Sequence, residues 1–266
     1  MSSEINNNNA FDGINRLFGN DACDILKDAH ICVIGLGGVG SWVVEALART
    51  GVGKLTLIDY DEVASSNINR QLHALHSTIG SKKTTAMRDR VMDINPQCTC
   101  NIIDDYFTIE NQWELLSADH HYDYVIDAID SIKFKAAIIY FCKRNKIPVI
   151  TTGGAGGVTD TTSIQVKDLS RTYNDALAAR VRSVLRAEYN FSKNPKRYFG
   201  VECIFSVQQK LYPKEDGKVT TSKPGIHGVH LDCRFGYGSV SFVTATFGLM
   251  AVSRVINKLL DKKRSR

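Results

Sequence analysis

Short apolar runs alternate with amphipathic segments through the first half of the chain. The apolar runs predict strands, at 30–34, 54–59, 98–104, 122–128 and 147–151. The segments between them have apolar residues at helical spacing and predict helices, at 41–50, 81–94 and 132–145. Strands that alternate with helices indicate a parallel sheet covered on both faces. The pattern therefore predicts an α/β fold with a doubly wound, mostly parallel sheet and helices on both faces.

The pattern becomes less regular after residue 151 and predicts a C-terminal extension of the same fold. Here we expect strands at 163–167 and 201–207, a helix at 175–189, a long loop at 213–230 and an apolar helix from about Ser239 to Leu260. The whole chain then divides into a flexible tail (1–12), one domain (13–260, with a nucleotide-binding core at about 30–155) and a charged tail (261–266).

Composition narrows the class of protein. With 266 residues, 43% of them hydrophobic, the chain can bury a sizeable core, and it contains no apolar run of 18 residues that would predict a membrane span. The N-terminus lacks the basic start and apolar stretch of a secretory signal. Seven scattered cysteines without a Cys-x-x-Cys pair fit neither a disulfide framework nor a four-cysteine zinc site. We therefore expect reduced thiols and a cytoplasmic protein with no membrane partner.

A glycine-rich turn follows the first predicted strand. Gly35, Gly37 and Gly40 satisfy G-x-G-x-x-G between this strand and a helix, and Gly38 lies in the same turn. Such a turn lets phosphate approach the backbone at a helix N-terminus, in a Rossmann-like arrangement. Asp59 ends the next strand, 19 residues after Gly40, where an acid binds ribose hydroxyls. These features predict a nucleotide site but fit NAD and ATP equally well.

A second polar cluster favours a triphosphate. Asp61, Asn67, Arg70, Gln71 and Lys83 follow the ribose-binding acid. A nicotinamide site does not need these groups, whereas arginine and lysine neutralise β- and γ-phosphates and an amide orients an oxygen. Considered alone, each charged residue would be interpreted as a solvated surface group. Together with the glycine turn, the cluster predicts an ATP site.

Two more carboxylates stand at the end of the predicted strand 122–128. Asp127 and Asp130 lie in VIDAIDS, at the edge of the sheet where ligands bind in such folds. Either of them could hold Mg²⁺ against phosphates, or Asp130 could cap the following helix. We assign the metal to Asp130 and treat Asp127 as a structural support of the cofactor site.

The chain resembles the ThiF/MoeB/ubiquitin-activating-enzyme superfamily in GLGGVGS, in D-Y-D-x-V-x-x-S-N-I-N-R-Q, and in Lys83 with the two strand-end acids. The resemblance covers nearly all of residues 13–160. It implies that Mg-ATP adenylates a carboxylate. It also implies ligand roles, with Asp59 on the ribose, Asn67, Arg70 and Lys83 on the phosphates, and Asp130 on Mg²⁺. Arg16, in NRLFG, resembles an arginine that reaches the nucleotide across a homodimer interface.

Within that superfamily, AIDSIKFKAAIIYFCKRNKIPVITTGGAGG and LDCRFGYGSVSFVTATFG resemble the tRNA threonylcarbamoyladenosine dehydratase group. The resemblance implies that the threonyl carboxylate of the modified adenosine in tRNA is adenylated and that the nucleoside then cyclises to a hydantoin. It also suggests a monovalent cation, K⁺ or Na⁺, whose ligands the sequence does not place, and a possible sulfur-relay protein partner.

Other functions stay open from the sequence alone. One is an adenylyltransferase that activates the C-terminus of a small sulfur-carrier protein, although the zinc-binding Cys-x-x-Cys pairs common in that group are absent. Another is an NAD(P)-binding oxidoreductase or a nucleotide sensor, and a pure tRNA-binding module is a third.

Three further features each allow two interpretations. Cys233 lies in a glycine-rich loop, and because cyclisation needs no thiol we interpret it as a packing residue. Residues 167–197 hold eight Lys or Arg against three acids, in a chain of net charge +5 and pI about 8.8. Such a run is a solvated face or a phosphate-contacting surface for tRNA. We also expect the TTGGAGG loop at 151–157 to line the substrate pocket or to form a simple turn.

Overall fold

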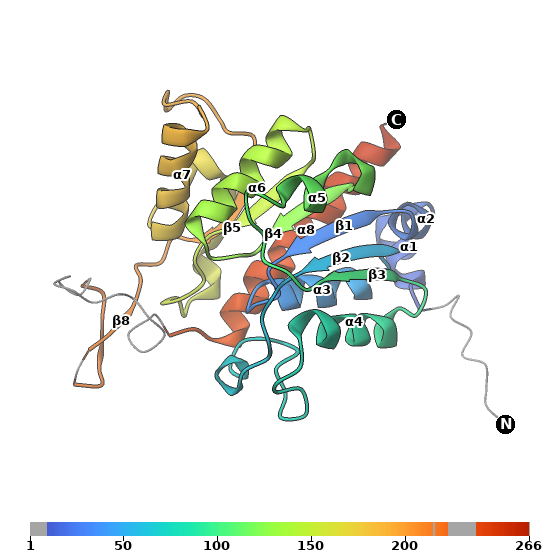
Figure 1. Cartoon of the computed structure of the whole chain (residues 1–266), viewed down its shortest axis with the longest axis horizontal. Helices are drawn as coiled ribbons and strands as arrows, with labels where there is room; N and C mark the ends of the chain where they lie inside the picture. Colours follow the sequence, from blue (N-terminus) through green and yellow to red (C-terminus); the bar gives the residue numbers. More distant parts are fainter. Residues whose placement is uncertain (1–9, 215, 223–237, 266) are drawn as a thin grey trace.

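The computed structural model describes residues 10–214, 216–222 and 238–265 (Figure 1). A seven-stranded sheet forms the centre of the molecule, in the order β3-β2-β1-β4-β5-β7-β6. All neighbouring strands are parallel except β6, which runs antiparallel to β7. The strands are β1 (His30–Ile34), β2 (Lys54–Ile58), β3 (Thr99–Ile103), β4 (Tyr124–Asp127), β5 (Val149–Thr152), β6 (Ile164–Asp168) and β7 (Glu202–Ser206).

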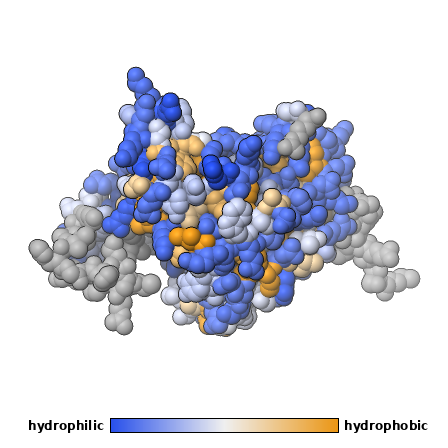
Figure 2. All heavy atoms as spheres, turned by 45° about the horizontal axis from the view of Figure 1, so that its top comes forward, coloured by the Kyte–Doolittle hydropathy of each residue, from blue (hydrophilic) through white to orange (hydrophobic). Residues whose placement is uncertain are grey.

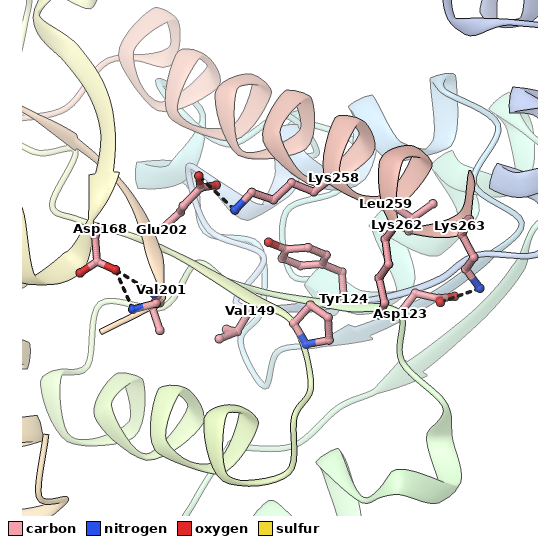
Figure 3. A pocket seen from close by; sticks show the side chains of 12 residues that line it. Asp123, Tyr124, Val149, Asp168, Val201, Glu202, Lys258, Leu259, Lys262 and Lys263 are labelled. Carbon is pink, nitrogen blue, oxygen red and sulfur yellow. Dashed lines mark hydrogen bonds and ion pairs between the residues drawn. The ribbon is translucent and has the colours of Figure 1, made fainter. Parts of the chain in front are cut away.

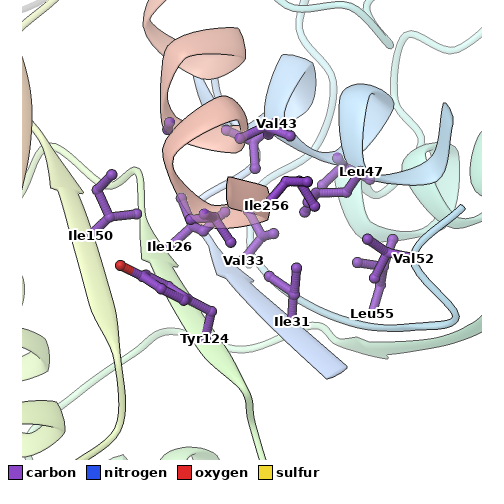
Figure 4. Packing of buried hydrophobic residues seen from close by; sticks show 14 of the residues in the cluster. Ile31, Val33, Val43, Leu47, Val52, Leu55, Tyr124, Ile126, Ile150 and Ile256 are labelled. Carbon is purple, nitrogen blue, oxygen red and sulfur yellow. The ribbon is translucent and has the colours of Figure 1, made fainter. Parts of the chain in front are cut away.

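Strand β1 shows why both faces of the sheet are covered. Ile31 and Val33 point into a core cluster with helices α3 and α8, whereas Cys32 and Ile34 alternate onto the opposite face. Figure 4 shows the first of these clusters, in which Val43 and Ile256 pack over the strand. Because these four side chains of β1 are all buried, the strand has a continuous apolar run rather than an alternating pattern.

The helices form two layers. Helices α3 (Gly40–Arg49), α4 (Lys83–Ile94) and α8 (Ser241–Arg264) contribute buried residues to the first cluster, and α5 (Gln112–Leu116), α6 (Ile132–Arg144) and α7 (Ala176–Glu188) to the second. Two short helices, α1 (Asp12–Phe18) and α2 (Ala22–Lys27), lie beside the amino end of β2, where the Gly53 N–H donates to the Leu26 carbonyl at 2.9 Å. The strand order reverses between β1 and β4, which places a crevice at the carboxyl ends of those strands.

Smaller elements complete the described chain. Short 3₁₀ turns occur at Ser65–Asn67, Ala118–His120, Thr161–Ser163 and Leu169–Arg171. Strands β8 (Tyr212–Pro213) and β9 (Val219–Thr220) pair as an antiparallel hairpin inside the segment we expected to be a loop.

The predicted α/β architecture is confirmed, and each strand and helix predicted between residues 30 and 207 is present. The predicted end of the last helix was wrong. Helix α8 continues to Arg264, so most of the charged tail is helical. Lys262, Lys263 and Arg264 in its last turn complement the negative end of the helix dipole. Asp12, assigned to the flexible tail, is the first residue of α1.

Helix α8 is long and apolar enough to cross a membrane by length and composition. Its apolar residues, among them Val243, Phe247 and Val255, are however buried against the sheet and α3, which accounts for this hydropathy. On the face shown in Figure 2, hydrophilic residues cover most of the surface and apolar residues appear in patches between them.

Candidate active site

The glycine turn between β1 and α3 is held by close backbone contacts. Gly35 has φ +88°, and a Cβ there would lie 2.8 Å from Ile129 and 3.1 Å from the Ala128 carbonyl oxygen. A Cβ at Gly40 would lie only 1.7 Å from the Gly35 carbonyl oxygen. At Gly37, by contrast, the nearest neighbour of an added Cβ would be the Gln71 side-chain nitrogen, 4.0 Å away. Gly35 and Gly40 are therefore required by packing, while Gly37 leaves room for an incoming group.

Helix α3 begins at this turn. Its N-cap residue, Val39, provides no side-chain hydrogen bond, and the Ser41 amide donates to the Gly37 carbonyl at 3.1 Å. The Gly40 amide has no hydrogen-bond partner among the described residues and is available to an anion. Gly38 lies against Thr244 of α8, where an added Cβ would be 3.1 Å from the threonine methyl group. The N-terminal end of α3 is thus packed directly against the C-terminal helix.

Asp59 joins the glycine turn to the end of β2. Its carboxylate accepts hydrogen bonds from the Leu36 N–H at 2.6 Å and from the Asp61 N–H at 2.8 Å. Burial raises the pKa of Asp59, while the positive charge of Lys83 and these two hydrogen bonds oppose the rise. The predicted ribose acid therefore also fixes the shape of the phosphate turn.

The segment after Asp61 folds back over α3. The Asn67 side-chain oxygen accepts from the Ala64 N–H at 3.1 Å, which closes the 3₁₀ turn. The Arg70 carbonyl accepts from the Trp42 indole and from the Thr244 hydroxyl, each at 3.2 Å. The Arg70 guanidinium donates to the Ser66 carbonyl and to the Asn69 side chain, and within the described residues it forms no ion pair. This guanidinium keeps its charge available for an anionic ligand.

Gln71 is buried beside the same turn. Its amide nitrogen is the nearest atom to the position of a Cβ on Gly37, and its side-chain oxygen has no hydrogen-bond partner among the described residues. A buried amide with an unused acceptor suits a site that is completed by a ligand or a water molecule.

Lys83 is the first residue of α4. Its side chain is 5% exposed, and its ammonium group lies 2.6 Å from the Asp61 carboxylate. Asp61 is more open, with a side-chain exposure of 42%. The pair brings two predicted site residues together and orients the lysine at the edge of the crevice.

The two strand-end acids have different environments. Asp127 is fully buried, 2.8 Å from the Lys135 ammonium and 2.6 Å from the Thr151 hydroxyl. Burial raises the pKa of Asp127, and Lys135 opposes that rise. This network ties β4 to α6 and β5, so Asp127 supports the site from inside the fold.

Asp130 is exposed and makes no hydrogen bond or ion pair with the described part of the chain. It follows Ala128 and Ile129, which pack directly on Gly35. A single carboxylate next to a phosphate turn suits Mg²⁺, because this ion usually binds one or two carboxylates together with substrate phosphates. No group of three or more His, Cys, Asp or Glu suited to a metal occurs among the residues that the structure describes. The site thus fits a phosphate-bound Mg²⁺ rather than a metal held by protein alone.

Arg16 lies at the other edge of the sheet. It is exposed in α1, which follows Phe11, and the Phe11 ring packs on Gly51 just before β2. The glycine turn stands at the opposite, carboxyl ends of the strands (Figure 1). Within one chain, therefore, Arg16 is not brought together with the other predicted site residues.

Position 233 lies outside the described residues, so the interpretation of Cys233 stays a prediction. The six described cysteines are free thiols. Burial raises the pKa of every one of them, which keeps them protonated and unreactive near neutral pH.

A cavity of about 580 Å³ lies away from these residues (Figure 3). Its walls include Tyr124, Val149 and Glu202, the first residues of three strands, so it lies at the amino edge of the sheet. Its charges are largely paired, with Lys258 on Glu202 at 3.0 Å and Lys263 on Asp123 at 2.8 Å. The position of this cavity at the amino edge and its paired charges both indicate that it is not the nucleotide site.

The sequence reasoning missed Lys135. A lysine within the apolar run FKAAII, in the first turn of α6 and eight residues after Asp127, is the available signal. The sequence alone does not identify Asp127 as its partner, because the two side chains meet only when α6 packs on β4.

The basic segment at 167–197 is only partly solvated. Arg180 is exposed on α7, opposite the buried Val181 and Leu185. Two other cations lie over aromatic rings, Arg171 over Tyr198 at 4.7 Å and Lys167 over Tyr173 at 4.8 Å. Both tyrosines are exposed, and exposed rings beside cations are typical of surfaces that contact nucleic acid.

Together, the doubly wound sheet, the open phosphate turn and the cationic cluster at its edge define a nucleotide-binding α/β protein. A family model described as the ThiF family matches residues 12–266. The chain belongs to the ThiF family.

The chain is similar over most of its length to proteins named as dehydratases. It is 56% identical over 253 residues to a tRNA threonylcarbamoyladenosine dehydratase of Haemophilus influenzae, covering 95% of this chain and 94% of that protein. It is 49% identical to the Escherichia coli protein of the same name, with the same coverage. A crystal structure of the E. coli dehydratase in complex with ATP matches with a TM-score of 0.86 at 45% identity, over 97% of this chain and 96% of that one.

Proposed function

We propose that this protein is an ATP-dependent dehydratase that acts on threonylcarbamoyladenosine in tRNA. The observation that carries the proposal is the joining of Gly37, Asp59, Arg70 and Lys83 at one sheet edge, in a chain similar over its full length to dehydratases of that name. The E. coli relative with ATP bound supports a nucleotide at this edge.

The reaction has two steps. The threonyl carboxylate attacks the α-phosphate of ATP, so that a C–O–P linkage forms and pyrophosphate leaves. A carbamoyl nitrogen then attacks the activated carbonyl carbon, AMP leaves and the five-membered hydantoin ring closes with net loss of one water. Because nucleophile and electrophile belong to one molecule, their effective concentration is high and no protein nucleophile is required.

The protein supplies charge and position. Amides at the start of α3 face the triphosphate, the Asp59 carboxylate takes the ribose, and Arg70 and Lys83 neutralise charge that develops on the phosphates. We assign Asn67 and Gln71 to orienting phosphate oxygens, and Asp61 to holding Lys83. Asp130 would hold Mg²⁺, which supplies electrostatic stabilisation at the phosphates.

The remaining parts of the proposal concern assembly and context. We propose a homodimer in which Arg16 of one protomer reaches the nucleotide of its partner, since Arg16 is far from its own glycine turn. We also propose a cytoplasmic location and a K⁺ or Na⁺ site without assigned ligands. The exposed rings of Tyr173 and Tyr198, with the cations of 167–197 that lie over them, support a tRNA contact.

Mass spectrometry of nucleosides tests the function. Threonylcarbamoyl-modified tRNA, incubated with the protein, Mg²⁺ and ATP, should lose one water from the modified adenosine, and Asp130→Ala should abolish this loss. Omission of ATP is the control. Unchanged tRNA together with ATP–pyrophosphate exchange on a sulfur-carrier protein would instead assign the alternative, a carrier adenylyltransferase.

Ligand protection separates these functions from an NAD enzyme. ATP should raise the melting temperature of the wild type, and Asn67→Ala, Arg70→Ala or Lys83→Ala should weaken this effect. Protection by NAD but not by ATP would overturn the proposal.

A further inference from the structure

A second cavity, of about 690 Å³, lies at the carboxyl edge of the sheet. It is bounded by the first two turns of α7, by the chain around Lys210 and by the end of the β8–β9 hairpin. Its lining includes Asp175, Ala179, Arg182, Gln209, Lys210 and Thr221. The cavity therefore lies on the same side of the molecule as the glycine turn, and not with the cavity of Figure 3.

Lys210 is the unusual residue in this cavity. It is 8% exposed, its ammonium group donates to the Gly154 carbonyl, and it forms no ion pair with the described residues. Burial lowers the pKa of Lys210, with Asp175 opposing the fall. A buried ammonium group without a carboxylate partner is costly unless an anion completes its surroundings.

The other charged groups leave the cavity positive. The Arg182 guanidinium donates to the Thr172 hydroxyl and likewise has no carboxylate partner among the described residues. Asp175, the one acid among the described lining residues, is 2% exposed and accepts from the Ala178 N–H at 2.8 Å and the Gly154 N–H at 2.9 Å. Two cations with unused donors face an acid already satisfied by backbone amides, so the cavity favours an anionic ligand.

The cavity adjoins the predicted nucleotide site. Gly154, whose carbonyl accepts the hydrogen bond from Lys210, lies two residues beyond the end of β5. Strand β5 pairs with β4, with Thr151 opposite Asp127. Asp130 lies three residues beyond the end of β4, and neighbouring parallel strands are about 4.8 Å apart. The Lys210 cavity and the Asp130 position therefore flank each other along one edge.

We propose that this cavity receives the modified adenosine of the RNA and that the Lys210 ammonium group holds its threonyl carboxylate. The proposal rests on the proposed function and adds a substrate-binding residue to it. The carboxylate must be ionised to attack phosphorus, and a buried cation both orients it and favours its charged form.

Equilibrium binding without ATP tests this proposal separately from turnover. The probes are an RNA stem-loop that carries threonylcarbamoyladenosine and the same stem-loop with unmodified adenosine. The wild type should prefer the modified RNA, and Lys210→Met should weaken its binding roughly tenfold or more while leaving the unmodified RNA unchanged. Lys214→Met, which changes an exposed lysine four residues away, is the matched control.

The outcomes separate two anion sources. Equal weakening of the binding of both RNAs by Lys210→Met would assign the lysine to a backbone phosphate and overturn the carboxylate proposal. Unchanged binding of both RNAs would also overturn it. Retained protection by ATP shows that the variant is folded. If Lys210→Met does not fold, Arg182→Gln takes its place and should reduce the preference for modified RNA, whereas an unchanged preference overturns the proposal. Failure of dehydration by the wild type would refute the proposed function without deciding this test.

Discussion

Individual side chains in this protein stabilise the site from positions that no ligand reaches. Asp127 and Lys135 form a buried ion pair, with side-chain exposures of 0% and 2%, between the end of β4 and helix α6. Such a pair adds little net stability compared with apolar residues, but the loss of one partner leaves a charge buried and uncompensated. The pair therefore fixes the position of the strand end that leads to Asp130.

Replacement of one partner should show this cost. We expect Lys135→Met to lower the free energy of unfolding by about 3–5 kcal/mol, because Asp127 is left unpaired. Lys133→Met, on the exposed side of the same helix, should change it by less than about 0.5 kcal/mol. Urea unfolding measures both variants. Equal effects of the two substitutions would contradict the assigned role of the pair.

His73 gives the molecule a pH-dependent stability. It is 3% exposed, neither ring nitrogen has a hydrogen-bond partner in the described structure, and burial, aided by the charge of Lys83, lowers its pKa to about 4. Below pH 6.5 the unfolded chain binds a proton at His73, whereas the folded chain does not bind one until about pH 4. The free energy of unfolding therefore decreases as the pH is lowered from about 6.5 to about 4.

For this residue alone we expect a loss of about 2 kcal/mol between pH 7 and pH 5. His73→Leu should remove this part of the pH dependence. Urea unfolding of both proteins at the two pH values provides the comparison. An equal loss in wild type and variant would show that His73 does not cause it.

At the scale of elements, the glycine turn illustrates what a sequence can reveal. Gly35, Gly40 and Asp59 were predictable because their chemistry repeats at fixed local spacing, and strands β1 to β5 because they are buried apolar runs. Helices α1, α2 and α5 were missed because five to seven residues carry too little periodicity.

Lys210 could not be predicted as a site residue for a different reason. Its contact with Gly154 joins positions 56 residues apart, and no local spacing records such a contact. The hydrogen bonds from Trp42 and Thr244 to the Arg70 carbonyl could not be predicted for the same reason.

Two glycines of the turn should respond differently to an added methyl group. Gly40→Ala places Cβ against the Gly35 carbonyl, so we expect a loss of more than about 3 kcal/mol in unfolding free energy. Gly37→Ala meets no close neighbour and should keep its stability, but its methyl group should weaken ATP binding roughly tenfold by intruding where phosphate approaches. Urea unfolding and calorimetric titration with ATP separate the two effects. Loss of stability in Gly37→Ala would argue against an open position.

At the scale of the whole molecule, the predicted site residues are divided between the two edges of the sheet. The glycine turn, Asp130 and Lys210 occupy the carboxyl edge, whereas Arg16 stands near the amino edge. Within a single chain Arg16 therefore has no role in the predicted site. In the proposed homodimer it reaches the nucleotide of the partner protomer.

Mixing of inactive variants tests this arrangement. Arg16→Ala and Asp130→Ala should each abolish dehydration, because each removes one group from every site. Subunit exchange between the two variants should restore about a quarter of wild-type activity, since mixed dimers contain one intact site. Recovery of no activity, despite exchange shown by native mass spectrometry, would place both residues in the same chain's site.

The contact between Trp42 and the Arg70 carbonyl has an optical consequence. The chain contains two tryptophans, and the other, Trp113, is largely exposed on α5. The Trp42 indole is the one that is hydrogen-bonded to the backbone of a predicted phosphate-binding residue. We expect occupation of the predicted site to change the electric field at that indole, so that the emission of Trp42 should report nucleotide binding without any added label.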